Sequence, residues 1–415
     1  MNRARGSVVA AVCGVLVLGG ASAARPVPGA PALDPIRLAV EGAASSGVSL
    51  AASGRDVVAT WAATAPGATD VYAAVSHDDG STFGAAKRVN DVPGDARTSG
   101  EQGPRVGIGT AVDVAWCSKA GTSARIRVAR SQAGATTFAP AVTVHAEDLP
   151  GVRGWASLAR DPEGNAHVVW LDGRAADHGA ASRSMRQDIF HAVWRTDGSH
   201  EEALVATDVC FCCKTAVATA PGGTVYVAWR HIYPTNLRDI AVARSSDGGK
   251  TFSAPVRVSE DGWQIAGCPD DGPALAVDES GTLHLVWPTM VGGADRAAVK
   301  GIFYSSSTDG GRTFAPRQRI DEEGTGAAHP QIAAGAGRVA IVWDEAGATR
   351  RACLREVSRD PKGPGSTPVL GPITVLSAGP AVYPAIAATP SSLVAAWTET
   401  AAAGSEIRVR RLPRP

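Results

Sequence analysis

The stretch ALAVDESGTLHLVW, residues 274–287, carries the pattern that decides the fold. It contains a short apolar strand, a polar turn with a glycine, and a second apolar strand that ends in tryptophan. The same pattern ends at six other tryptophans: Trp61, Trp116, Trp170, Trp229, Trp343 and Trp397. Successive copies are 54 to 59 residues apart, so the chain consists of seven repeats of one unit.

Each repeat carries signals for four short strands. A loop after the tryptophan leads into a third strand, such as residues 240–244, and a polar turn leads into a fourth, such as residues 255–259. Alternating patterning with glycine turns is typical of a propeller blade. We therefore predict an all-β fold, a seven-bladed β-propeller of four-stranded antiparallel blades. The tryptophans are expected to fill the space between neighbouring blades.

The two ends of the chain are predicted to meet in the last blade. The seventh repeat ends with its third strand, at residues 407–410, and has no fourth strand of its own. Residues 36–40, which precede the first repeat, resemble the fourth strands elsewhere. Pairing these two segments would close the ring and remove two open sheet edges.

The N-terminal segment has the features of an export signal. A short basic head, residues 1–5, is followed by an apolar run and then by Ala21-Ser22-Ala23, a small-x-small cleavage pattern. The apolar run is too short to span a bilayer. We expect a signal peptide at 1–23, a linker at 24–33 and the propeller at 34–411, located outside the cytoplasm in the periplasm or the medium.

The charge balance excludes some classes of partner. The chain has 40 basic and 40 acidic residues, which cancel. Such a chain offers no electrostatic basis for binding nucleic acid or an anionic membrane surface. No later segment is apolar enough to predict a membrane span.

A polar turn between the third and fourth strands repeats the pattern Ser-x-Asp-x-Gly-x-Thr-Phe. It occurs at residues 76–83, 245–252 and 307–314, with a degraded copy at 131–138. This pattern resembles the Asp box, or BNR repeat, of sialidase-like β-propellers. Its aspartate can accept backbone N–H bonds while its glycine adopts a positive φ, so we expect these aspartates to be structural.

The resemblance implies an activity as well as a fold. It suggests an exo-acting glycoside hydrolase, similar to sialidases, that acts on acidic sugars. That family binds the substrate carboxylate with three arginines, pairs a tyrosine nucleophile with a glutamate and uses an aspartate as general acid. This chain departs from the family in having seven repeats rather than six, and in lacking a Phe/Tyr-Arg-Ile-Pro motif.

Strand order predicts which loops share a face. The loops after the tryptophans, and those that enter each first strand, lie opposite the Asp-box turns at the mouth of the channel. Cysteines are concentrated in these loops. Cys210, Cys212 and Cys213 enter the fourth repeat, Cys268 enters the fifth, and His231 lies between them in the sequence.

Three interpretations of these cysteines remain open. An exported chain with six mature cysteines can pair them all in disulfides. Alternatively, thiolates with a nearby imidazole suit copper or zinc, which makes these four cysteines and His231 candidate metal ligands. A third possibility is a redox-active thiol. Cys353, in a third strand, is expected to be a buried small hydrophobe.

Other polar residues are predicted on the same face. The candidate ligand-binding arginines, which could hold a carboxylate or sulfate, are Arg105, Arg153, Arg174 and Arg230. The candidate catalytic residues for glycosidic chemistry are Tyr233, Asp172 and Glu399. Asp344 could line the same polar pocket, and the alternative for this set of arginines, acids and Tyr233 is that they are rim residues in salt bridges. The same mapping brings His178 and His329 to this face.

The expected partner is a small molecule, a glycan or a metal ion at the mouth. A module that uses the propeller face to assemble with another protein is the further alternative.

Overall fold

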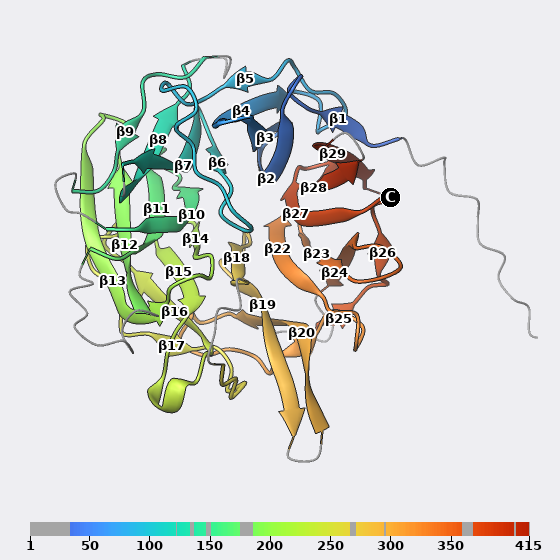
Figure 1. Cartoon of the computed structure of the whole chain (residues 1–415). Helices are drawn as coiled ribbons and strands as arrows, with labels where there is room; N and C mark the ends of the chain where they lie inside the picture. Colours follow the sequence, from blue (N-terminus) through green and yellow to red (C-terminus); the bar gives the residue numbers. More distant parts are fainter. Residues whose placement is uncertain are drawn as a thin grey trace, which may run out of the picture. The chain divides into compact units, whose positions relative to one another are not determined.

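The computed structural model describes residues 34–414, except 122, 133–136, 147–150, 175–185, 266–270, 294–295, 359–367 and 402–403. Residues Pro35–Pro415 form one compact unit. Within this unit, seven antiparallel sheets are arranged as blades around a ring (Figure 1). The predicted fold class, an all-β propeller with seven blades, is confirmed.

The first four blades follow the chain in order. Blade 1 contains β2 (Ala44–Ser53), β3 (Asp56–Ala65), β4 (Ala68–Ser76) and β5 (Lys87–Arg88). Blade 2 contains β6 (Arg105–Ile108), β7 (Val112–Ala120), β8 (Ser123–Arg130) and β9 (Val142–Thr143). Blade 3 contains β10 (Arg153–Arg160), β11 (Ala166–Asp172), β12 (Arg186–Trp194) and β13 (His200–Cys210). Blade 4 contains β14 (Ala216–Thr219), β15 (Val225–Arg230), β16 (Ile240–Ser245) and β17 (Val256–Arg257).

The remaining blades bring the chain back to its start. Blade 5 contains β18 (Ala274–Val277), β19 (Leu283–Gly293), β20 (Arg296–Ser307) and β21 (Gln318–Arg319). Blade 6 contains β22 (Ala328–Gly335), β23 (Arg338–Glu345), β24 (Arg351–Ser358) and β25 (Val369–Leu370), and β26 (Thr374–Val375) also pairs with β24. Blade 7 contains β27 (Ala381–Ala388), β28 (Ser392–Ala401), β29 (Gly404–Pro413) and β1 (Ile36–Leu38).

The ring closes as the sequence predicts. Strand β1 pairs with β29 in antiparallel register, with Ile36 opposite Val409 and Leu38 opposite Ile407. The N-terminal strand is therefore the fourth strand of blade 7, and Figure 1 shows β1 beside β29. Leu38 and Ile407 share a core cluster with Trp61 of blade 1, so this joint also ties blade 7 to blade 1.

The seven repeat tryptophans form the core between blades. Each is at most 1% exposed and lies on the second strand of its blade. Trp170 of blade 3 packs with Ala115 and Ile126 of blade 2, and Trp229 of blade 4 packs with Val169 of blade 3. The predicted role between blades is confirmed, because each such contact joins one blade to the preceding one.

The three Ser-x-Asp-x-Gly-x-Thr-Phe turns share one hydrogen-bond pattern. In the first, Ser76 Oγ donates to Asp78 Oδ1 at 2.8 Å and accepts the N–H of Gly80 at 2.9 Å. The backbone N–H and the hydroxyl of Thr82 donate to the two Asp78 oxygens at 2.8 and 2.7 Å. Asp247 and Asp309 accept the equivalent bonds in blades 4 and 5. These aspartates therefore stabilise the turn itself.

Helical structure is scarce in the described part of the chain. The helix within the loop after β15 is a single 3₁₀ turn, η2 (Pro234–Asn236). Among the described residues, no helix has the length and apolar character needed to cross a membrane.

Candidate functional site

Seven equivalent positions, one per blade, lie at the start of the innermost strands. Strand pairing defines these positions. In each blade, one residue of the innermost strand pairs with the residue directly before the buried tryptophan. These residues are Ser49, Arg105, Ser157, Ala216, Ala274, Gln331 and Ala385. Two residues earlier stand Gly47, Gly103, Trp155, Lys214, Gly272, His329 and Tyr383. We call these seven residues the entry ring. Adjacent innermost strands contact one another all the way around, so the entry ring encircles the channel mouth.

Three residues of the entry ring have a strained backbone, with φ in the left-handed region. Trp155, His329 and Tyr383 have φ values of 50°, 54° and 51°, at β-bulges in β10, β22 and β27. A bulge redirects a side chain, and a non-glycine residue in the left-handed region costs about 1–3 kcal/mol. Because proteins retain such strain mainly at functional sites, these side chains mark the mouth as the candidate site.

A carboxylate is buried within the entry ring. Glu101 belongs to the β5–β6 connection, residues 89–104, which reaches toward the ring centre (Figure 1). One carboxylate oxygen pairs with Lys214 Nζ, and the other accepts the backbone N–H of Gly272 at 2.9 Å. Both side chains of the Glu101–Lys214 pair are 3% exposed. Within the entry ring, one cation and one backbone N–H donor thus hold the carboxylate of Glu101.

His329 is fixed beside this carboxylate by a second acid. Its Nδ1 lies 2.8 Å from Asp344 Oδ2, and its backbone N–H donates to Asp271 Oδ1 at 3.1 Å. Asp344 also accepts the backbone N–H of Tyr383 at 2.8 Å and an ion pair from Arg350. The rings of His329 and Tyr383 are 4.4 Å apart between centroids. One acid therefore orients both strained side chains.

The charges in this cluster shift the acidity of its members. Although burial lowers the pKa of His329, the hydrogen bond to Asp344 and the charges of Asp271 and Glu101 raise it above its ordinary value. Burial raises the pKa of Glu101, against the opposing effect of Lys214. Burial also raises the pKa of Asp271, but the charge of Lys300, 2.7 Å away, is chief among the effects that lower it overall.

Two cavities adjoin the entry ring. A small one of about 20 Å³ is lined by Glu101, Arg105, His329, Gln331 and Tyr383, among others. A larger one of about 180 Å³ lies along the innermost strands, where Arg105, Ser157, Lys214, Thr215 and Gln331 contribute polar groups. Arg105, Gln331 and the entry ring thus surround a space that a ligand group could enter.

The predicted arginines occupy different environments. Arg105 lines both cavities, and its Nη2 donates to the backbone carbonyl of Glu101 at 2.5 Å. Arg153 is buried and pairs with Asp172 at 2.9 Å, and Arg174 pairs with both Asp172 and Glu202. Arg230 is fully buried and donates to the carbonyls of Arg238, Asp271 and Pro288. Of the four, Arg105 lies at the cavities.

Three other predicted residues share one contact with the repeat tryptophans. Asp172 accepts the indole N–H of Trp170 at 2.8 Å, and Glu399 accepts that of Trp397 at 3.3 Å. His231 accepts the indole N–H of Trp229 at 3.3 Å. All three stand two residues after a tryptophan, as does Glu345, which binds Trp343. Each of these residues therefore has the same structural role in its own blade, which is to accept the indole N–H of the buried tryptophan.

Tyr233 lies beyond the end of β15. Its ring packs on His231, 4.6 Å between centroids, and under the guanidinium of Arg257 at 4.9 Å. Its hydroxyl is buried without a hydrogen-bond partner in the described structure, and burial raises its pKa to about 12. The described contacts of Tyr233 do not include Asp172 or Glu399, so the three catalytic candidates are not brought together there.

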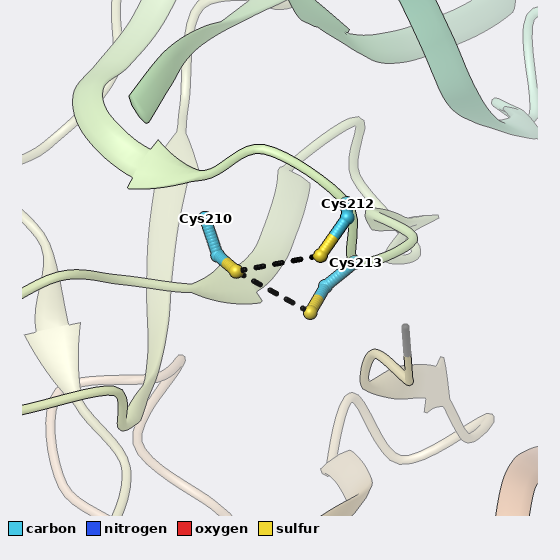
Figure 2. Close-up of side chains that lie close together, drawn as sticks. All are labelled: Cys210, Cys212 and Cys213. Carbon is cyan, nitrogen blue, oxygen red and sulfur yellow. Dashed lines mark hydrogen bonds between the residues drawn. The ribbon is translucent and has the colours of Figure 1, made fainter. Parts of the chain in front are cut away.

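The cysteines of the fourth entry loop form a compact cluster. Cys210, Cys212 and Cys213 are all buried, and their sulfurs lie within 4.8 Å of one another (Figure 2). Cys213 Sγ donates to Cys210 Sγ at 3.6 Å, and the Cys210 and Cys212 sulfurs are 4.0 Å apart. Cys210 and Cys213 are free thiols, whereas Cys212 is disulfide-bonded.

The cluster favours a thiolate at Cys210. The hydrogen bond from Cys213, together with the charges of Arg230 and Arg238, lowers the pKa of Cys210 to about 6. Burial raises the pKa of Cys213. His231 is not among the described residues whose ligand atoms join this cluster, and Cys268 and His178 lie outside the described residues.

Two other cysteines lie apart from this cluster. Cys117 donates to the backbone carbonyl of Arg153 within the core between blades 2 and 3. Cys353 is fully buried on β24, and burial raises its pKa to about 12.

Sequence reasoning missed Glu101, Lys214, Asp271 and Tyr383. A signal for part of this set is present, because His329-Pro330 and Tyr383-Pro384 repeat the Gly-Pro dipeptides at 103–104 and 272–273. An alignment of the repeats on their tryptophans reveals the entry ring, because His329 and Tyr383 stand where other repeats have glycine. Glu101 carries no such signal, since it reaches the site through an irregular loop.

Comparison with known proteins identifies the fold. No family model and no curated protein matches this sequence. Among solved structures, a polysaccharide lyase, Uly1, has a TM-score of 0.53 at 12% identity over 88% of this chain and 90% of its own. A protein of unknown function from Dyadobacter fermentans has a TM-score of 0.52 at 13% identity, over 94% of this chain and 100% of its own.

A mutant Trypanosoma rangeli sialidase with trans-sialidase activity has a TM-score of 0.50 at 11% identity over 91% of this chain. This chain spans only 57% of the length of that enzyme. At these identities the likeness is one of fold alone: the chain has the propeller architecture that sialidases and a polysaccharide lyase also use.

Proposed function

We propose that this chain acts on glycans and binds an acidic sugar at the entry ring. The observation that carries this proposal is the buried carboxylate of Glu101, held by Lys214 and the Gly272 N–H beside His329. A sugar carboxylate is chemically the same group. Fixed cations and backbone N–H donors are the usual means of binding it.

The charge of the mouth supports an anionic ligand. The cationic side chains of the cluster are Arg105, Lys214, Lys300, His329 and Arg350, and the acids are Glu101, Asp271 and Asp344. With His329 protonated, cations outnumber acids in this set. An incoming carboxylate that displaced Glu101 would find its partners already in place, which reduces the cost of ordering the site. In this proposal Glu101 is an internal competitor of the ligand.

His329 and Tyr383 supply acid–base groups to the same space. A histidine oriented by Asp344, with its pKa raised, can hold or donate a proton to a glycosidic or ring oxygen. The phenol of Tyr383 is placed beside it by the strained bulge of β27. The likeness of fold to a polysaccharide lyase and to a sialidase mutant agrees with chemistry on sugars.

The test is binding of the full chain to polysaccharides that differ in charge. Calorimetry and affinity electrophoresis should show binding to uronate-containing or sialylated glycans and none to neutral glycans. Glu101→Gln should bind more tightly, because the competing charge is removed, and His329→Gln should bind more weakly. Equal binding to neutral and acidic glycans, or no binding at all, would contradict the proposal.

Cleavage is tested separately. Release of methylumbelliferone from acidic glycosides would indicate hydrolysis, and ultraviolet absorbance of a new double bond would indicate elimination. Tyr383→Phe should abolish either activity while retaining binding. Catalysis through Tyr233, Asp172 or Glu399 instead would appear as loss of activity in Asp172→Asn or Glu399→Gln with Tyr383→Phe unaffected.

We also propose that the mature chain begins after residue 23 and works outside the cytoplasm. The basic head, apolar run and small-x-small pattern of the N-terminal segment support export. Fractionation of the native host, followed by N-terminal sequencing, tests this proposal. A chain that starts at Met1 and is recovered from the cytoplasm would refute it.

We propose a second role, soft-metal binding, for the cysteine cluster. The two free thiols of the cluster, Cys210 and Cys213, favour it, because thiolates are the ligands that copper and zinc prefer. The sequence candidates Cys210, Cys212 and Cys213 are together, while Cys268 and His231 remain candidates without a described place in the cluster. Elemental analysis of protein purified without chelator tests this role; absence of bound metal after incubation with copper and zinc would exclude it.

A further inference from the structure

Two fully buried arginines, Arg238 in contact with Cys210 and Arg230 near enough for its charge to act on that sulfur, have no carboxylate partner among the described residues. Arg238 donates from Nη1 to Cys210 Sγ at 3.2 Å and from Nε to the Asn236 side-chain oxygen at 3.0 Å. Arg230 donates to backbone carbonyls and stacks on Trp263. Among the described residues, neither forms an ion pair with an acid. A buried cation is stabilised by an anion, and the sulfur that Arg238 contacts, Cys210 Sγ, is a group that can carry negative charge.

The two free thiols are spaced to share one ion. Cys210 and Cys213 sulfurs are 3.6 Å apart, with two residues between them in the sequence. Two sulfurs bound to one tetrahedral ion, each at about 2.3 Å, lie roughly 3.8 Å apart, and more when the angle at the metal opens. An ion held by these two sulfurs alone, on opposite sides, needs a separation of roughly 4.6 Å, twice the metal–sulfur distance, so side-chain rotations must open the pair by about 1 Å.

The number of ligands argues against zinc. Within the described structure, the cluster contains no histidine or carboxylate, and the sulfur of Cys212 is already disulfide-bonded. Two free thiols remain among the residues that the structure describes, whereas a structural zinc ion takes four ligands. Soft sulfur ligands select Cu(I), which two thiolates can hold.

The net charge of the metal–thiolate complex also favours Cu(I) over Zn²⁺. One Cu(I) ion with two thiolates carries a single negative charge, which the adjacent guanidinium of Arg238 offsets. One Zn²⁺ ion with two thiolates is neutral and would leave both buried arginines without an anion. We infer that Cys210 and Cys213 form a two-thiolate site for Cu(I), with Arg238 as its charge partner. This inference rests on the soft-metal role proposed above and narrows it to one ion and two ligands.

The test is competition for metal under anaerobic conditions. The full chain is equilibrated with the coloured Cu(I) complex of bicinchoninate, and in parallel with a chromogenic zinc complex. Long incubation is needed, because the sulfurs are buried. Wild-type protein should withdraw one equivalent of copper and no zinc. Cys210→Ser and Cys213→Ser should withdraw no copper, whereas Cys353→Ser, which removes an equally buried thiol on β24, should behave as wild type.

Arg238→Gln provides the charge test. It keeps a hydrogen-bond donor near Cys210 but removes the positive charge, so Cu(I) affinity should fall by roughly 10- to 100-fold, the usual effect of losing a partner of a metal ligand. X-ray absorption at the copper edge of the wild-type complex should show two sulfur neighbours. This measurement does not depend on how well any variant folds.

The outcomes separate the inference from the role on which it rests. Zinc uptake equal to copper uptake, or three or more ligands at copper, would overturn the Cu(I) site and leave a metal-binding role standing. Copper retained by Cys210→Ser would also overturn it. Failure of the wild-type protein to bind either metal would refute both.

Discussion

At the scale of the residue, a glycine in each Ser-x-Asp-x-Gly-x-Thr-Phe turn lies against the preceding blade. Gly249 and Gly311 are equivalent and have φ values of +90° and +78°. A Cβ on Gly249 would overlap the imidazole of the buried His191, whereas one on Gly311 would meet its nearest side-chain carbons at 3.5 Å or more. Gly311→Ala should therefore cost about 1–2 kcal/mol from backbone strain alone.

Gly249→Ala should cost about 1–3 kcal/mol more than Gly311→Ala, because overpacking adds to the same strain. Urea unfolding of the two variants measures the difference in free energy of unfolding. Equal losses would show that blade 4 moves away from blade 3 without penalty, contrary to the packing described.

The aspartates of these turns should make the fold sensitive to acid. Hydrogen bonds from the side chain and then the backbone of Thr82 lower the pKa of Asp78 to about 2. A depressed folded-state pKa gives stability that is present above the unfolded value near 4 and is lost as pH falls toward 2. Thr82→Val should raise the Asp78 pKa in an NMR titration and flatten this acid loss, while Thr82→Ser should keep both. An unchanged pKa in Thr82→Val would contradict the assignment.

Residue types alone did not reveal which mouth residues are structural. Asp172, His231 and Glu399 were candidates because they follow tryptophans on the mouth face, yet that same position lets each accept an indole N–H. An acid two residues after a buried indole N–H can be satisfied locally, and the sequence does not show whether it is. The cysteine cluster was predictable, because its three members are sequence neighbours that share one short loop.

At the scale of the element, a strand of three residues, β1, closes the ring. β1 has three residues, but it covers the edge of β29 and places Leu38 in the core shared with Trp61. Deleting residues 34–41 should lower the melting temperature markedly, because it exposes a sheet edge and a core cluster together.

Arg37→Ala is the matched control for this deletion. Arg37 is 63% exposed and forms a surface ion pair with Glu406, so its loss should change stability by less than about 1 kcal/mol. Calorimetry of the two variants checks both expectations. A deletion variant that melts with the wild type would show that blade 7 is stable with three strands.

Strand order and ring closure were predictable because they follow from repetition. Seven copies of one pattern specify seven similar sheets, and the count of strands specifies the closure. The bulges at the starts of β10, β22 and β27 were not predictable in the same way. Each bulge lies at the start of its strand, before the alternating stretch from which that strand is predicted, so the alternation does not reveal it.

At the scale of the whole molecule, the mouth is joined by an ion pair between distant segments. Glu101 of the β5–β6 connection meets Lys214, which lies 113 positions later, and contacts Gly272 at the entry to blade 5. Lys214 also donates to Pro330 of blade 6 at 3.1 Å. Four separate parts of the ring therefore converge on one buried charge pair. No local sequence pattern could indicate such a contact.

For the Glu101–Lys214 pair we predict that stability and glycan binding respond differently to substitution. Lys214→Met should destabilise the fold by about 3–5 kcal/mol, because it leaves the carboxylate of Glu101 buried without its partner. Glu101→Leu combined with Lys214→Met should recover most of that loss, since replacing both members of a buried pair by apolar groups is often neutral. Denaturant unfolding of the single and double variants measures this recovery.

Acidic-glycan binding should not recover with stability. The double variant folds but lacks the Lys214 cation, so calorimetry should find its affinity for acidic glycans lost, whereas Glu101→Gln binds more tightly than wild type. If the pair served only to hold the β5–β6 connection in place, the double variant would bind as the wild type does. Unfolding and binding measurements on the same variants of Glu101 and Lys214 therefore decide whether the entry ring binds a ligand or only holds the blades together.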